Sequence, residues 1–209
     1  MIIKNFIVFE GIDGAGTTTQ LKKLADRIGE DKVYSSAEPT KGETGLFLRR
    51  MLKGDFSVSE KTASYLFAAD RAEHIYGKDG VIDQTQKGKI ALSDRYFFSS
   101  LAYQSVSCGK ELPELINSPF PLPQILFYFK IDPEISLKRV TARGETTEIY
   151  EKIEIQKKTA ELYDAVMEEY KGPKGSGMTL VEVDATKTIP EIQDFIWNKV
   201  NSIIFHSDK

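Results

Sequence analysis

Residues 6–20, FIVFEGIDGAGTTTQ, have the composition and spacing of an anion-binding loop. An apolar run leads into glycines at positions 11, 14 and 16, and a helical pattern starts at Thr17. Glycines allow successive backbone N–H groups to point at one anion, and the N-terminal end of a helix adds a partial positive charge. The segment therefore predicts phosphate binding. The alternative is a glycine-rich turn that binds nothing.

The loop approximates the pattern G-x-x-x-x-G-K-[ST], in which the lysine reaches the β- and γ-phosphates and the hydroxyl reaches Mg²⁺. The two glycines are Gly11 and Gly16, Thr18 supplies the hydroxyl, and Thr17 stands where the lysine would be. Thr17 can donate only a neutral hydrogen bond. We expect nine consecutive residues to contact nucleotide phosphates: Gly11, Ile12, Asp13, Gly14, Ala15, Gly16, Thr17, Thr18 and Thr19.

Charged residues follow two further apolar runs. The tripeptide EPT occupies residues 38–40, and Asp94 and Arg95 end the run IALS. An aspartate that ends a strand beside such a loop is placed for Mg²⁺, directly or through water, and an arginine fork suits phosphate. The alternative is an ion pair between Asp94 and Arg95, which is weakened because adjacent strand residues point to opposite faces. Of Arg49 and Arg50, one is expected to face solvent and the other the cleft.

Strand-like runs alternate with helical patterns, which predicts βαβ units and an α/β three-layer sandwich with a five-stranded parallel sheet. Ligands of such sheets bind beyond the carboxyl ends of the strands. The length of 209 residues suits one domain covering residues 1–209. The expected strands are Asn5–Glu10, Lys32–Ser36, Ile90–Ser93, Gln124–Ile131 and Thr179–Val183. The expected helices are Thr17–Ile28, Ser59–Tyr76, a helix from Pro133, Glu148–Tyr170 and Pro190–Ile204.

The composition excludes several classes of function. A net charge of −3 lacks the basic footprint of a nucleic-acid-binding protein. The lone Cys108 forms no intrachain disulfide, and His74 and His206 lack the spacing of zinc ligands. No apolar run approaches the roughly 18 residues of a membrane span, and the N-terminus lacks the layout of a signal peptide. We therefore expect a cytoplasmic protein without nucleic-acid or membrane partners.

With GIDGAG, EPT and DRY in this order, the sequence resembles the thymidylate kinases, which are P-loop nucleoside monophosphate kinases. The resemblance runs from Phe6 to about Val200. Its most specific parts are LFAADRAEH at residues 66–74 and DRYFFSSLAYQ at residues 94–104. It implies a P-loop kinase fold with a helical lid at about residues 143–158, ATP and Mg²⁺ as cofactors, and a homodimer. The implied reaction transfers a phosphoryl group from ATP to dTMP, giving dTDP and ADP.

The resemblance also implies residue roles at the phosphate end of the acceptor site. Asp13 would contact the sugar and the acceptor phosphate region, and Arg49, in the G-x-x-x-R pattern from Gly45, would bind the monophosphate. Arg95 would bridge the acceptor and donor phosphates. The expected catalytic residues are Asp13, Arg95 and Arg143.

At the base end, Phe67 would stack on thymine and Arg71 would hydrogen-bond a thymine carbonyl. Tyr103 would pack under the sugar and disfavour a 2′-hydroxyl. The alternatives are that Phe67 belongs to the core and that Arg71 is a surface cation. The full set expected to bind dTMP is Asp13, Glu38, Arg49, Phe67, Arg71, Arg95, Ser99, Ser100 and Tyr103.

The sequence departs from the family pattern at positively charged positions. Besides Thr17, neutral residues stand at Gly14, at Ile149 in the lid and at Ala37 before EPT. The remaining cations near the lid are Arg139, Arg143, Lys152, Lys157 and Lys158. Three functions stay open: an active thymidylate kinase, a nucleotide-binding protein with weak or no kinase activity, and a kinase for another deoxynucleoside monophosphate.

Overall fold

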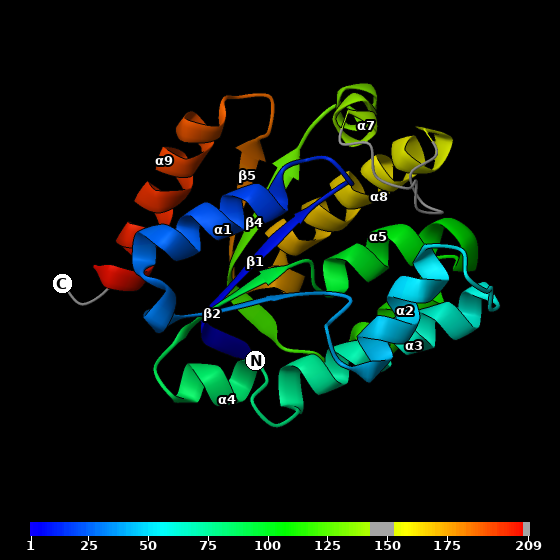
Figure 1. Ribbon diagram of the computed structural model, residues 1–209, viewed down its shortest axis with the longest axis horizontal. Helices are drawn as coiled ribbons and strands as arrows, with labels where there is room; N and C mark the ends of the chain where they lie inside the picture. Colours follow the sequence, from blue (N-terminus) through cyan, green and yellow to red (C-terminus); the bar gives the residue numbers. More distant parts are fainter. Residues whose placement is uncertain (143–152, 207–209) are drawn as a thin grey trace.

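The computed structural model describes residues 1–142 and 153–206 and contains one five-stranded sheet (Figure 1). All strand pairs are parallel, in the order β2-β3-β1-β4-β5. The strands are β1 (Ile2–Gly11), β2 (Val33–Ala37), β3 (Ile90–Asp94), β4 (Leu122–Lys130) and β5 (Thr179–Asp184). The predicted five-stranded parallel sheet is confirmed, with strand ends displaced by up to three residues.

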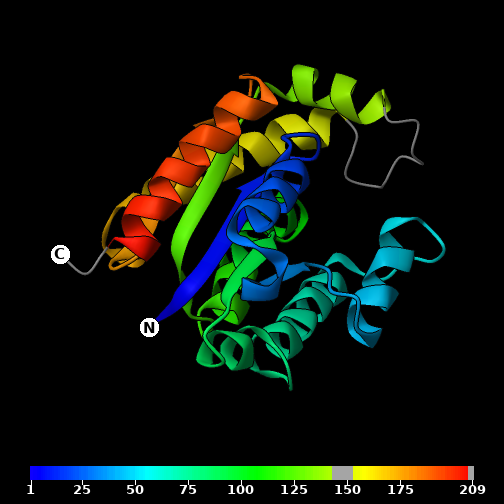
Figure 2. The ribbon, with the colours of Figure 1, turned by 60° about the vertical axis from the view of Figure 1, so that its left-hand side comes forward.

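Helices cover both faces of this sheet, so the expected three layers are confirmed (Figure 2). On one face, α1 (Thr17–Ile28) packs against α9 (Ile189–Val200), and on the other, α5 (Phe97–Cys108) packs against α8 (Ile153–Lys171). The remaining α-helices are α2 (Glu43–Leu52), α3 (Glu60–Tyr76), α4 (Val81–Gln86), α6 (Glu111–Asn117) and α7 (Pro133–Thr141). Short 3₁₀ turns span Glu30–Lys32 and Pro173–Gly175, and a π-helical turn, Asn201–Phe205, follows α9.

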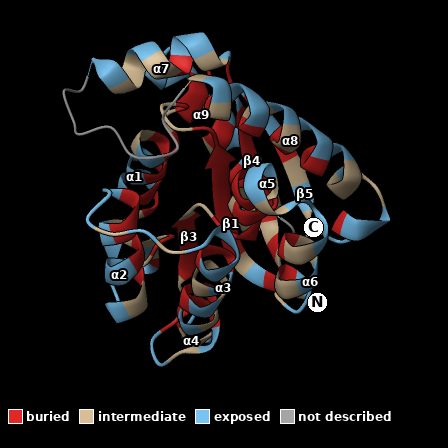
Figure 3. Cartoon of the chain, turned by 90° about the vertical axis from the view of Figure 1, so that its right-hand side faces the viewer, coloured by how far each residue is buried: buried red, intermediate tan, exposed pale blue. Residues whose placement is uncertain are grey.

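The core lies around the central strand β1, whose residues Phe6, Ile7, Val8 and Phe9 are fully buried (Figure 3). Both faces of β1 are covered, which explains why its sequence is a continuous apolar run and not an alternating one. The register pairs Phe9 with Asp94, so the carboxyl ends of β1 and β3 reach the same edge of the sheet. The residues that follow these strands therefore meet there.

Capping residues in the sequence locate several helix starts. The Ser59 hydroxyl accepts a hydrogen bond from the Thr62 amide at 3.2 Å, and the Asp132 carboxylate accepts one from the Glu134 amide at 2.7 Å. Both residues are good N-caps because their side chains satisfy N–H groups that have no partner within the helix. The expected helices do not include α4, α5 or α6. Helices α4 and α6 are short, and most residues in the first two turns of α5 are buried, so none of the three shows a long amphipathic repeat.

Of the expected lid at residues 143–158, only residues 153–158 are described, as the first turns of α8. Arg143, Ile149 and Lys152 lie outside the described residues. Among the helices of residues 1–142 and 153–206, none combines the length and apolar character of a membrane span.

Candidate functional site

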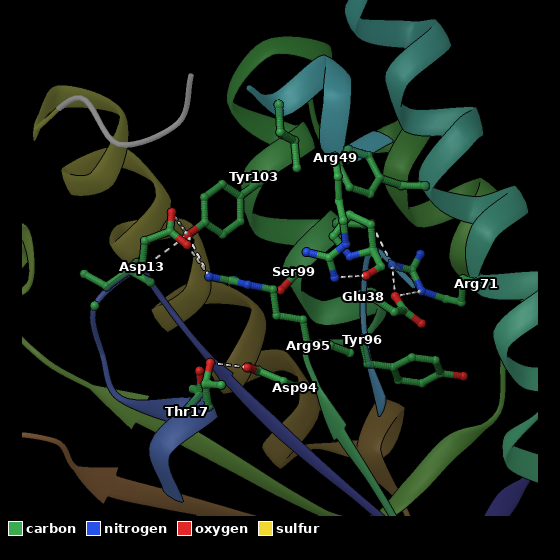
Figure 4. Close-up of a pocket in the computed structure, with 18 of the residues that line it drawn as sticks. Asp13, Thr17, Glu38, Arg49, Arg71, Asp94, Arg95, Tyr96, Ser99 and Tyr103 are labelled. Carbon is green, nitrogen blue, oxygen red and sulfur yellow. Dashed lines mark hydrogen bonds and ion pairs between the residues drawn. The ribbon is translucent and has the colours of Figure 1, made fainter. Parts of the chain in front are cut away.

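A cleft of about 510 Å³ opens at the carboxyl edge of the sheet, and most of the predicted site residues line it (Figure 4). This volume suits a small-molecule ligand. Arg95 reaches from the end of β3 toward Asp13, and Arg71 and Glu38 lie together at the opposite end (Figure 4). The predicted residues that line the cleft are Ile12, Asp13, Gly14, Gly16, Thr17, Thr18, Thr19, Glu38, Arg49, Phe67, Arg71, Asp94, Arg95, Ser99, Ser100 and Tyr103.

The loop between β1 and α1 has the conformation that an anion-binding loop needs. Gly14 and Gly16 have φ values of +86° and +98°, which residues with a Cβ rarely adopt. Gly16 is the N-cap of α1, and no side chain accepts a hydrogen bond from the first turn of this helix. Those N–H groups therefore remain available for phosphate oxygens.

Helix α7 packs directly on this loop and leaves no room for a side chain at position 14. A Cβ atom there would lie 2.5 Å from the carbonyl oxygen of Ser136 and 3.0 Å from a methyl carbon of Val140. The Ser136 hydroxyl also donates a short hydrogen bond to the carbonyl oxygen of Asp13. The packing of the helix thus requires glycine at position 14, which excludes an arginine there.

Thr18 and Asp94, the two expected metal ligands, contact each other, because the Thr18 hydroxyl donates a short hydrogen bond to Asp94 Oδ2. The other carboxylate oxygen, Asp94 Oδ1, is buried and has no hydrogen-bond partner. A hydroxyl beside a carboxylate with an unpaired oxygen fits Mg²⁺, which prefers oxygen ligands and retains several waters. Within the described part of the chain, no group of three or more His, Cys, Asp or Glu side chains forms a separate metal cluster.

Arg95 pairs with the loop and not with its neighbour Asp94. Its Nη2 atom lies 2.5 Å from Asp13 Oδ1, and its Nη1 atom donates to the carbonyl oxygen of Gly11 at 3.0 Å. The Arg95 backbone has a φ of +75°, which turns the chain sharply at the end of β3. The alternative of an Asp94–Arg95 ion pair is therefore wrong.

Glu38 and Arg71 form a buried ion pair at the other end of the cleft. Arg71 Nη2 lies 2.7 Å from Glu38 Oε2, and the side chains of Arg71 and Glu38 are 1% and 4% exposed. His74 Nδ1 lies 2.9 Å from the other carboxylate oxygen. Arg71 also donates to Asn117 Oδ1 at 2.5 Å and to Ser100 Oγ at 3.1 Å. This burial excludes the alternative that Arg71 is a surface cation.

The structure separates the two neighbouring arginines of α2. Arg49 lines the cleft, and it donates to the carbonyl oxygen of Thr40 at 3.2 Å and to that of Pro39. The side chain of Arg50 is 65% exposed and lies 3.4 Å from Asp55. Gly45 allows this arrangement, because a Cβ atom there would collide with the backbone of Thr40.

Three aromatic residues, Phe67, Tyr96 and Tyr103, line the cleft. Phe67 is half-buried on α3, where it packs on the small cluster of Leu48, Met51, Leu52 and Ala63. The Tyr103 hydroxyl donates to Asp13 Oδ2 at 3.0 Å, and its ring lies 5.1 Å from the Arg95 guanidinium carbon. Phe67 is therefore a core residue and also a cleft residue, which leaves one part of its ring surface available to a ligand.

Comparison with known protein families matches the thymidylate kinase family over residues 9–196. The chain belongs to the thymidylate kinase family.

Its relatives include a "Putative thymidylate kinase" of Treponema pallidum, 40% identical over 197 residues, which cover 93% of this chain and 94% of the relative. A "Probable thymidylate kinase" of Methanocaldococcus jannaschii is 36% identical over 97% of this chain and 99% of the relative. A "Thymidylate kinase" of Leptospira borgpetersenii is 35% identical over 78% of this chain and 80% of the relative. The resemblance found in the sequence is thereby confirmed.

Three residues of this thymidylate kinase family member were missed in the sequence because their partners are distant in the chain. Glu10, at the end of β1, is fully buried and hydrogen-bonds Tyr163 of α8 at 2.8 Å. Gln156, at the start of α8, donates to Asp13 Oδ2 at 2.9 Å. The EG dipeptide at positions 10–11 was the available signal, since a carboxylate inside an apolar strand needs polar partners.

The lysine and arginine candidates for the missing charge differ in their surroundings. Lys157 pairs with Glu134 at 2.9 Å and Lys158 with Glu161 at 3.0 Å, and both lysines are more than half exposed. Arg139 is half-buried on α7, three residues after Ser136, and forms no ion pair within residues 1–142 and 153–206. Of the candidates within residues 1–142 and 153–206, Arg139 is therefore the one without an acidic partner.

Arg49→Met is expected to raise the KM for dTMP at least tenfold, whereas Arg50→Met leaves it within twofold. Arg49 lines the cleft and Arg50 faces solvent, while the two substitutions remove the same charge from adjacent positions. Hydrogen bonds to charged groups contribute about 1.5–3 kcal/mol, which corresponds to about a 10- to 150-fold change in affinity. Steady-state kinetics with varied dTMP measures both. Equal effects of the two substitutions would contradict this assignment.

The buried Glu10 makes folding stability depend on pH. Burial raises the pKa of Glu10 from 4.5 to about 7, against the opposing effects of Arg95 and the surrounding hydrogen bonds. Between these values the folded protein retains a proton that the unfolded chain releases, so the free energy of unfolding falls as pH rises. The raised pKa of Glu10 contributes about 3 kcal/mol to the free energy of unfolding at low pH, and this contribution is lost as the pH rises to about 7. Urea unfolding at pH 5 and pH 7.5 measures this effect. The free energy of unfolding should decrease less between these pH values in Glu10→Gln than in the wild type. Equal decreases would contradict the role of Glu10.

Proposed function

We propose that this protein transfers the γ-phosphoryl group of ATP to dTMP. The observation that carries the proposal is that one cleft joins an uncapped, glycine-rich helix start to a pocket containing Arg49, Phe67 and Arg71. The loop offers N–H groups to the phosphates of the donor, and the pocket offers an aromatic face and cations to the acceptor. Family membership supports the same reaction.

We propose roles for the cleft residues from the family resemblance, and their positions in the cleft support them. Arg95 lies beside the loop and within the acceptor cleft, where its guanidinium can bind oxygens of both phosphates. Arg49 binds the acceptor phosphate, Phe67 stacks on the base and Arg71 donates to a base carbonyl. Each of the three guanidinium nitrogens of Arg71 donates a hydrogen bond, to Glu38, Asn117 or Ser100, so its orientation is set before the ligand binds. Phosphoryl transfer consists mostly of positioning and charge neutralisation, and these contacts supply the positioning.

Thr18 and Asp94 would hold Mg²⁺, directly or through water, with Asp94 Oδ1 as the available oxygen. A bound Mg²⁺ neutralises the charge that develops on the phosphate oxygens. Asp13 has a different task, because Arg95, Tyr103 and Gln156 already hold its carboxylate. Asp13 fixes Arg95 and Tyr103 at the sugar end of the acceptor site.

A coupled assay of ADP release with ATP and dTMP tests the proposal. Turnover that depends on dTMP and Mg²⁺, with dTMP preferred in competition among the four deoxynucleoside monophosphates, is the expected result. Calorimetry with dTMP and ATP completes the test. Tight binding without turnover at high enzyme concentration would instead assign a nucleotide-binding protein, and preference for another monophosphate would overturn the thymidylate assignment.

We further propose that the protein is a cytoplasmic homodimer, with its interface on α3, α5 and α6. These helices contact one another and expose large apolar side chains on their outer surface: Tyr65, Tyr76, Val106 and Leu115. Apolar residues gathered on neighbouring helices favour burial against a second copy. Light scattering after size exclusion tests this, and Tyr65→Lys should shift a dimer toward monomer. A monomeric mass for the wild type at micromolar concentration would refute the dimer.

A further inference from the structure

Glu10 is a buried carboxyl that none of the roles above uses. It lies in β1 immediately before the phosphate-binding loop and is fully buried. A carboxylate removed from water in the centre of a sheet is costly unless it is hydrogen-bonded. The hydrogen-bond partners of Glu10 therefore indicate which part of the site depends on this residue.

Four donors surround the Glu10 carboxylate. The backbone N–H groups of Tyr96 and Ser99, at the start of α5, donate to Oε1 at 2.7 and 3.2 Å. The hydroxyls of Ser99 and Tyr163 donate to Oε2 at 2.6 and 2.8 Å. The two backbone N–H groups can only donate to Glu10, and an ionised Glu10 carboxylate accepts from both hydroxyls as well.

The same two hydroxyls contact Arg95. Arg95 Nη1 donates to Ser99 Oγ at 3.1 Å and to the Tyr163 hydroxyl at 3.3 Å. A hydroxyl has one proton, so a hydroxyl that donates to Glu10 turns its lone pairs toward Arg95. A protonated Glu10 would itself donate to one hydroxyl. That hydroxyl would then direct its proton elsewhere, toward its neighbour or toward the guanidinium.

We infer that Glu10 is a positioning residue whose ionised form orients the Ser99 and Tyr163 hydroxyls and thereby aims Arg95 for phosphoryl transfer. The part of the inference that concerns phosphoryl transfer rests on the proposed function. The part that concerns the orientation of Arg95 by Glu10 does not. It also accounts for Ser99, which lies between Glu10 and Arg95 in the structure.

Protonation near neutral pH makes the inference testable. The pKa of Glu10 is raised to about 7 by burial. The charged and titratable groups around it are Arg95 after β3, Tyr163 from α8, Asp13 from the loop and, in the paired strand, Tyr128. Burial raises the pKa of the Tyr163 and Tyr128 phenols, so both remain neutral when Glu10 titrates. A decrease in pH toward 6 therefore changes the charge of Glu10 before that of either phenol.

The kinetic experiment compares wild type and Glu10→Gln between pH 5.5 and 8.5. Glutamine retains the shape but presents an N–H group to the two hydroxyls. We expect kcat at pH 8 to fall about 10- to 100-fold, since small misplacement of a catalytic group has effects of this size. The wild-type kcat should decline below pH 7, as Glu10 becomes protonated. The variant should decline only near pH 6, where phosphate monoesters such as the substrate become protonated. A variant with wild-type kcat, or with an unchanged acid limb, would overturn the inference.

A second measurement is independent of turnover. In protein labelled with ¹⁵N-arginine, the side-chain signals of Arg95, assigned by their absence in Arg95→Lys, should shift with a midpoint near pH 7 in the wild type. They should not shift in Glu10→Gln. An inactive wild type that shows the shift would refute the proposed function and support the positioning of Arg95. An active wild type without the shift would support the proposed function and overturn the positioning of Arg95 by Glu10.

A third variant covers the case in which Glu10→Gln does not fold. Tyr163→Phe keeps Glu10 and removes one hydroxyl from the contact with Arg95. We expect a three- to thirtyfold lower kcat, with a smaller change in the KM for dTMP, because a neutral hydrogen bond of about 1 kcal/mol or more is lost. Wild-type kcat in Tyr163→Phe, with unchanged Arg95 signals, would contradict the inference.

Discussion

Thr17→Lys is expected to raise kcat for phosphoryl transfer about 10²-fold, since one preorganised charged donor typically contributes a factor of about 10²–10³. The reason is that the rest of the loop is already assembled. Gly14 and Gly16 have the required backbone angles, and the first turn of α1 is uncapped. Thr17 lines the cleft and is 8% exposed, so a longer side chain there would start from the wall of the cleft.

The matched control is Thr17→Met, which has a similar length and no charge. Stopped-flow or coupled assays at saturating ATP and dTMP should separate the two variants, with methionine at or below the wild-type rate. A lower kcat in Thr17→Lys would contradict the expectation and would mean that another cation already occupies this position. Arg139→Met, combined in turn with threonine, lysine and methionine at position 17, then tests whether α7 supplies that cation.

Arg71→Met is expected to destabilise the protein by about 3–5 kcal/mol, because it leaves Glu38 as an uncompensated buried charge. It should also weaken dTMP binding at least tenfold. The guanidinium joins α3 to Glu38, to Asn117 of α6 and to Ser100 of α5, so its loss removes a donor from three acceptors and leaves Glu38 with His74 alone among these side chains. Urea unfolding measures the first effect and calorimetry with dTMP the second.

A double variant separates the two effects. Glu38→Gln in the Arg71→Met background removes the isolated charge and should recover a large part of the stability. It should not recover dTMP affinity, because the donor to the base is still absent. Recovery of both would show that Arg71 acts only through folding, and recovery of neither would place the stability loss in the contacts to Asn117 and Ser100.

The loop, the strands and the placement of Arg95 and Arg71 in one cleft were within reach of sequence reasoning because their signals are local. Residues 6–20 contain strand, turn and helix start in one stretch, and five apolar runs predict five strands. The choice between Arg49 and Arg50 was not local. It depends on how closely α2 approaches residues 38–40, which Gly45 allows.

The polar partners of the site were harder to predict for a physical reason. Glu10 and Tyr163 are 153 residues apart in sequence, and Gln156 and Asp13 are 143 apart. Contacts at such separations are determined by the packing of α8 against α5 and the sheet, and no short pattern records them. Arg143, Ile149 and Lys152 lie outside the described residues, so their predicted roles stay predictions.

The contact between α7 and the phosphate-binding loop limits how this enzyme can change. An arginine at position 14 needs space that the backbone of Ser136 occupies, so a single substitution there first has to displace a helix. Position 17 requires no such displacement. A laboratory selection for faster turnover should therefore recover lysine at 17, or a cation from beyond residue 142, long before it recovers arginine at 14. The packing of one helix thereby determines which of two catalytic solutions is accessible to the lineage.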